Sequence, residues 1–194
     1  MVSFGQISET LSGYQQPEPI QKKPGEFDDI LKEIYSEMPV LKQHDFVVKK
    51  VDRLSEHGGS LEFYSPREPD NPHGKPYIEL YKNAPTERAD LKKAIWGDML
   101  HHLSSADPHW KSLRGEYMEG RDKKQIDFDN NKYQQLVKEG REKRSFDDWM
   151  NYSWSDASVR EPLKGNPEWS WFQTPAQKDV LQRMDSYLRT GKRD

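Results

Sequence analysis

The chain has 194 residues, no cysteine and a formal net charge of −3 at pH 7. The missing cysteines exclude disulfide bonds and thiolate metal sites, and the small negative charge argues against nucleic acid as a main partner. Charged and hydrophobic residues each make up 32% of the chain, so we expect one domain with a tail and a small, aromatic-rich core.

Two further features of the sequence bear on where in the cell the protein is found. No apolar run is long enough to span a membrane, and no signal segment opens the chain. We therefore expect a soluble protein, cytoplasmic where it is made, with no membrane partner.

The first 25 residues are predicted to form a flexible arm. They are rich in Gln, Pro, Ser and Glu and cannot bury enough apolar surface to fold alone. Such an arm either stays disordered or becomes ordered against a partner. Residues 26–194 are then expected to form a single domain with a helical C-terminal extension. The domain opens with an amphipathic helix that Pro39 ends.

Three short segments have the composition of β-strands. They are residues 45–53, 60–65 and 77–82, which are rich in β-branched or alternating apolar residues. The proline-rich piece at 66–76 predicts an exposed loop. Three strands predict a small sheet, antiparallel or mixed.

A central helix is predicted to begin at Pro85 and to run to about Ser104. Its apolar residues fill one half of a helical wheel, whereas Asp98 and His101 fall on the other half and His102 lies at the boundary. The predicted fold class is therefore α+β, with a small three-stranded sheet packed on this central helix and a helical C-terminal half.

The polar half of this helix carries the sequence Gly97-Asp98-Met99-Leu100-His101. Together with the strand and short connection before it, this segment resembles the core of the zincin metallopeptidases, whose helix carries His-Glu-x-x-His. In that motif both His bind zinc and the Glu activates a metal-bound water. The resemblance implies that His101 is the second ligand and Asp98 the general base. Gly97 falls on the first ligand position and has no side chain to bind a metal.

Other residues near this motif have both a metal-binding and a plain structural interpretation. The longer zincin motif would place Asp107 on the third ligand position, but an Asp N-cap followed by Pro108 explains the same residues without a metal. Asp98, His102 and His109 together would also suit zinc. Alternatively, Asp98 and His102 form an ordinary pair on the helix surface, and His109 is a packing residue. The candidate metal ligands are His101, His102, Asp107 and His109, and the candidate catalytic residue is Asp98.

The C-terminal half is predicted to be helical. Helices are expected at 108–120, at 132–144 and from Ser145, with a polar connection at 125–132. The aromatic-rich segment 154–172 predicts either a local core or a docking surface.

The last helix has the clearest boundaries in the chain. Thr174 and Gln177 form a capping-box pattern around Pro175, and Gly191 follows the end of the helix.

Two classes of function follow from this sequence. The first is a catalytically degenerate zincin-like protein, because a site without its first imidazole holds zinc poorly. The sequence as a whole also resembles those of small phage-encoded zincin-like proteins. That similarity implies a structural or interaction role in a virion, with other virion proteins or further copies of the chain as partners and no cofactor.

The second class is an active zinc-dependent peptidase with Asp98 as general base. We favour the first class, because glycine at the first ligand position removes a metal ligand altogether, whereas the change from Glu to Asp only shortens the carboxylate of the general base.

Overall fold

The structure is a computed structural model, and it describes residues 25–56, 59–66, 71, 73–165 and 173–193. Residues 1–24 of the predicted arm and residues 166–172 of the aromatic-rich segment lie outside the described residues. The elements in chain order are α1 (Asp28–Glu37), the 3-10 helix η1 (Pro39–His44), β1 (Val47–Lys50), β2 (Leu61–Tyr64), β3 (Tyr77–Leu80), α2 (Arg88–Ala106), α3 (Pro108–Glu119), α4 (Lys123–Lys138), α5 (Phe146–Trp149), the π-helix η2 (Met150–Trp154), α6 (Ser155–Leu163) and α8 (Pro175–Thr190).

The three strands form one mixed sheet in the order β1-β3-β2. Strand β1 runs parallel to β3, with Val47 opposite Tyr77, and β2 runs antiparallel to β3, with Leu61 opposite Leu80. Ile78 and Leu80 are buried in the core, so one side of the sheet faces α2. This arrangement confirms the predicted small sheet and its mixed alternative.

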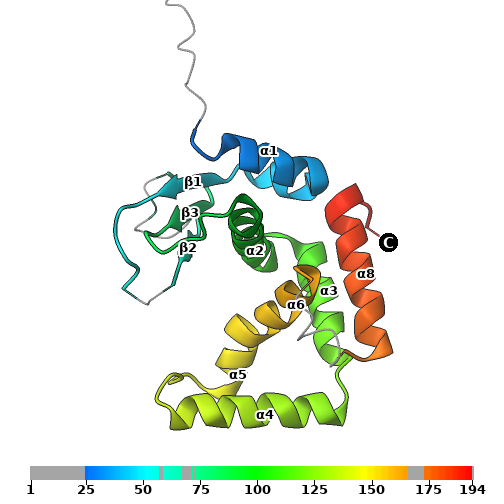
Figure 1. Cartoon of the computed structure of the whole chain (residues 1–194). Coiled ribbons are helices and arrows are strands. Elements are labelled where there is room, and N and C mark those ends of the chain that lie inside the picture. Colours follow the sequence, from blue (N-terminus) through cyan, green and yellow to red (C-terminus); the bar gives the residue numbers. More distant parts are fainter. Residues whose placement is uncertain (1–24, 57–58, 67–70, 72, 166–172, 194) are drawn as a thin grey trace, which may run out of the picture.

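Helix α2 is the centre of the molecule. Figure 1 shows it between the sheet on one side and helices α3, α6 and α8 on the other. Met99 and Leu100 of α2 belong to the same buried cluster as Ile34 of α1 and Met184 of α8. The predicted α+β class with a helical C-terminal half is confirmed. No helix in the described part of the chain is both long enough and apolar enough to cross a membrane.

The prediction for residues 125–132 was wrong. These residues lie inside α4 rather than in a polar connection, and the part of the predicted helix after residue 138 is not helical. A capping box between Asp122 and Gln125 starts α4, and the chain leaves it through Gly140, whose φ is 69°. The local caps decide these boundaries, and the polar composition of the segment concealed them.

Candidate functional site

The predicted polar face of α2 is covered by α6. The Nη1 atom of Arg160 donates a hydrogen bond to the Gly97 carbonyl oxygen at 3.3 Å and lies 3.5 Å from Asp98 Oδ1. A Cβ atom added to Gly97 would meet side-chain atoms of Lys164 at 3.5 to 3.6 Å. Two cationic side chains therefore approach the positions that the zincin resemblance assigns to a ligand and a general base.

These residues do not fit a zincin-type zinc ion. Gly97 offers no ligand atom, and a divalent cation beside Asp98 would be repelled by Arg160 and Lys164. Within the described part of the chain, no group of three or more His, Asp or Glu side chains is arranged to hold a metal.

His101 and His109 lie in separate surroundings. His101 is exposed, with its ring centre 5.9 Å from that of Phe63. The ring of His109 lies 4.7 Å from that of Tyr187 on α8. The structure therefore does not bring Asp98, His102 and His109 together, because they face α6, η1 and α8 respectively.

Asp107 is the N-cap of α3. One carboxylate oxygen accepts a hydrogen bond from the Trp110 backbone N–H at 2.9 Å, and the other accepts one from the Tyr187 hydroxyl at 2.5 Å. Burial acts to raise the pKa of Asp107, but the hydrogen bonds from Tyr187 and the backbone outweigh it and leave the pKa below its usual value. The cap interpretation of Asp107 and Pro108 is confirmed.

His102 has a partner that sequence reasoning missed. Its Nε2 atom lies 3.1 Å from Nδ1 of His44, and the rings meet edge to face beside Phe46 and Phe63. Burial lowers the pKa of both imidazoles, that of His102 to about 4, with further lowering from the charges of His44 and His101. Both rings are therefore neutral at pH 7.

Burial indicates which ring nitrogen of His102 carries the proton. The Nδ1 atom of His102 has no hydrogen-bond partner among the described residues. A buried N–H without an acceptor is rarer in proteins than a buried acceptor without a donor, so the His102 proton is assigned to Nε2, from which it is donated to His44. The pair is a neutral connection between η1 and α2. A metal bound at Nε2 would force the proton onto the unpartnered nitrogen, so the pair is a poor metal site.

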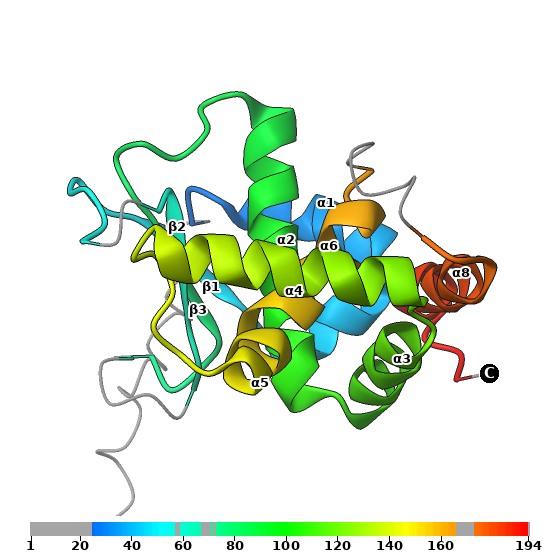
Figure 2. The ribbon, with the colours of Figure 1, turned by 90° about the horizontal axis from the view of Figure 1, so that it is seen from below.

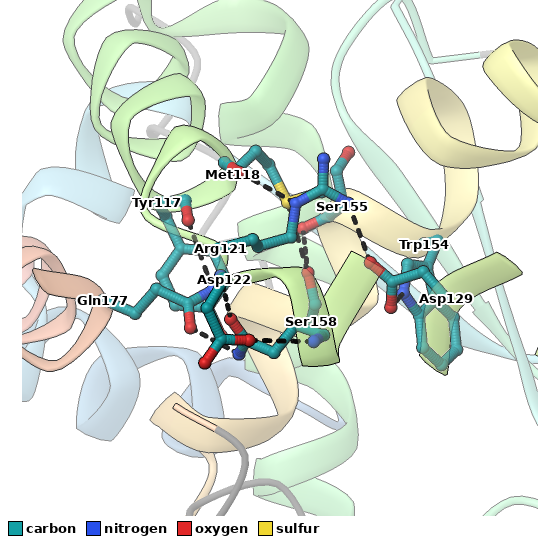
Figure 3. A network of polar contacts seen from close by, with 10 residues as sticks. Tyr117, Met118, Arg121, Asp122, Asp129, Trp154, Ser155, Ser158 and Gln177 are labelled. Atoms are coloured by element: carbon teal, nitrogen blue, oxygen red, sulfur yellow. Dashed lines mark hydrogen bonds and ion pairs between the residues drawn. The ribbon is translucent and has the colours of Figure 1, made fainter. Parts of the chain in front are cut away.

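A second polar cluster lies between α3, α4 and η2 (Figure 3). Asp129 accepts hydrogen bonds from Arg121 at 2.7 Å and from the Trp154 indole at 2.6 Å. Burial raises the pKa of Asp129 in spite of these bonds. The adjoining cavity measures about 40 Å³, which holds a few water molecules and is too small for a substrate. The cluster is therefore structural.

The far side of the sheet carries a larger hollow of about 330 Å³. Three of its charged groups, Arg53, Glu62 and Glu79, already have partners in the sheet. Arg53 donates to Glu79 at 2.7 Å, and the Tyr81 hydroxyl donates to Glu62. Arg53 also lies over the ring of Tyr81. Its lining is mostly polar and charged, and in this it differs from the apolar pockets that bind most small molecules.

Comparisons with known proteins do not place the chain in a family. A scan against protein-family models, a search of curated proteins and a search of solved structures each returned no match. The zincin-like interpretation therefore depends on the motif around Gly97 and Asp98.

Proposed function

We propose that this chain is a non-enzymatic interaction protein, a zincin-like scaffold that has lost its metal chemistry and serves as a structural component of an assembly. The main support is the contact of Arg160 and Lys164 with α2 at Gly97 and Asp98. A general base must approach a metal-bound water. Here Asp98 faces an arginine, and the first ligand position is vacant.

A role in assembly is supported by the exposed apolar residues of α4. All residues of α4 are described, and only Asp129 among them is buried. Ile126, Phe128 and Val137 are 43%, 41% and 41% exposed. Ile126 and Val137 project from one flank of the helix, whereas Phe128 projects from the other, with its ring centre 6.3 Å from that of Trp154. The suggestion that the assembly is a phage particle rests on the sequence resemblance to phage-encoded zincin-like proteins.

Hydrolysis of an unfolded protein substrate tests the non-enzymatic part of this proposal. The full chain is incubated with added zinc beside the Asp98→Ala variant, with a chelator as a further control. We expect no cleavage above background in any sample. Zinc-dependent cleavage that is lost in Asp98→Ala would establish the alternative, a zinc peptidase with Asp98 as its base.

The interaction part is tested by comparing the full chain with a chain that begins at Glu26. Sedimentation velocity reports the size of each, alone and with candidate components of the same assembly. We expect the full chain to enter larger species. If both chains remain monomers in every mixture, the assembly role is contradicted.

A further inference from the structure

The helical segment after α4 contains a rare turn. Helices α5, η2 and α6 follow one another without a break over residues 146–163, and the middle piece, η2, is a π-helix. There the Ser155 backbone N–H donates to the Met150 carbonyl oxygen, five positions back instead of four. The Asn151 carbonyl oxygen, four positions back, accepts the Ser155 hydroxyl at 3.2 Å. This turn therefore holds one residue more than a turn of α-helix.

The residues of η2 do not account for this turn by themselves. Positions 150–154 contain no proline and no glycine, so nothing in their composition opposes an α-helix. π-helices are rare in proteins and are often found at functional positions. A helix that keeps one needs contacts that an α-helix would not provide.

The contacts that depend on this turn involve two indole rings. Trp149 and Trp154 are stacked, with ring centres 4.9 Å apart and an angle of 22° between their planes. Residues five positions apart project about 140° from each other in an α-helix. In a π-helix the hydrogen bonds join residues five positions apart, so such residues lie on the same side. The stack therefore requires the π-turn.

Helix α4 contacts both of these rings. It lies at the end of the molecule opposite α1 (Figure 1), and Figure 2 looks onto it from below. The Trp154 indole donates to Asp129 of α4 at 2.6 Å (Figure 3), and the ring of Trp149 lies 5.5 Å from that of Tyr133 of α4. Helix α6 is held separately, because its Val159 is buried in the main core. The docking of α4 therefore favours the π-turn, and α5 is the piece that can turn when α4 leaves.

We propose that η2 is a conformational switch set by α4: it is a π-turn when α4 is docked and an α-helix when α4 is released. The conversion turns α5 by about 100° around the helix axis relative to α6. It separates the two indole rings and moves Trp149, which is 3% exposed in the docked state. Release of one helix thus changes the direction of its neighbour. This inference goes beyond the proposed function and does not depend on it.

Circular dichroism tests the switch, because two stacked indoles couple and give a pair of bands of opposite sign. The chain has six tryptophans, so the signal of this pair is the difference between a chain and the same chain with Trp149→Phe. Asp129→Ala, which releases α4, is expected to lose most of this signal. Asp127→Ala is the matched control, because Asp127 is exposed on the same helix, and it should leave the signal unchanged.

Deletion of Asn151 distinguishes the switch from a direct effect of α4 on the rings. Asn151 is exposed, and without it Trp149 and Trp154 are four positions apart, so a plain α-helix brings them together whether or not α4 is docked. We expect the deletion variant to show the indole signal and to keep it when Asp129→Ala is added. Because docking then requires no π-turn, the amides of α4 should exchange several-fold more slowly than in the unaltered chain.

Protection of the α8 amides checks that each variant is folded. The inference is overturned by any of three results. The first is an indole signal that Asp129→Ala leaves intact in the unaltered chain. The second is a signal that Asp129→Ala removes equally with and without Asn151. The third is a deletion variant that does not fold, since an extra residue can be removed without disturbing the helices on either side.

Discussion

At the scale of single residues, Gly97 decides both the proposed loss of chemistry and part of the stability of α2. Glycine inside a helix costs backbone entropy. A methyl group at this position would lie 3.5 to 3.6 Å from the Lys164 side chain, an ordinary contact distance.

We therefore expect Gly97→Ala to raise the free energy of unfolding by about 1 kcal/mol. Denaturant unfolding measures the change. Gly115→Ala on α3 is the matched control, because a Cβ there meets no atom within 4 Å, and it should give a similar gain. If Gly115→Ala stabilises the protein and Gly97→Ala destabilises it, the Lys164 side chain leaves no room for a methyl group at position 97, which contradicts the prediction.

Glu142 makes a local contribution that depends on pH. Hydrogen bonds from the Arg144 side chain and backbone, opposed by burial, lower the pKa of Glu142 from 4.5 to about 2. Because the folded pKa lies below the unfolded one, the ionised carboxylate stabilises the folded state fully above pH 4.5. That contribution is lost as the pH falls from 4.5 towards 2.

We expect the stability of the wild-type protein to fall more steeply with acidification over this range than that of Glu142→Gln. Urea unfolding at a series of pH values measures both slopes. Identical slopes for the two proteins would show that the Glu142–Arg144 contact does not contribute.

At the scale of elements, hydrogen bonds join the start of α8 to the end of α3. Thr174 Oγ1 accepts a hydrogen bond from the Gln177 backbone and donates one to the Gly120 carbonyl oxygen at 2.8 Å. The Gln177 side chain donates to the Tyr117 carbonyl oxygen at 3.2 Å. One capping box thus begins a helix and also joins it to its neighbour.

Thr174→Ala removes both bonds of the threonine hydroxyl. We expect it to lower the free energy of unfolding by about 1 to 2 kcal/mol, measured by thermal or denaturant unfolding. Thr174→Ser keeps the hydroxyl and should retain most of the stability. A loss of equal size in the serine variant would assign the effect to the missing methyl group.

At the scale of the whole molecule, α4 is attached to the domain through few contacts. Its single buried residue, Asp129, receives bonds from Arg121 and from Trp154 of η2. Because α4 contributes little else to the core, its opening is expected to cost less than unfolding of the whole domain.

We expect Asp129→Ala to lower the free energy of local opening of α4 by about 3 kcal/mol, because it leaves Arg121 and the Trp154 indole without their acceptor. Asp129→Asn keeps one acceptor oxygen and should cost less. Amide hydrogen exchange measures both variants: protection should fall in α4 and stay unchanged in α8. A uniform fall across the chain would show that α4 unfolds only with the core.

The sequence could predict those features whose causes are local. The α2 helix, its apolar half and the Asp107 cap are encoded within a few turns of chain, so periodicity and capping patterns identified them. The polar face of α2 was predicted correctly as polar, but its neighbours were not. Gly97 is buried and Asp98 half-buried, because α6 covers them.

By itself, the sequence determined the α+β class, the three strands, the cap of α8 and the absence of a ligand atom at Gly97. Only the tertiary structure decided that Arg160 reaches Gly97 from 63 positions away and that His102 meets His44 across 58 positions. Hydrogen-bonding and helical patterns act over a few residues and leave a trace in the sequence. Contacts between distant segments depend on how the complete core packs, which no short stretch of residues encodes.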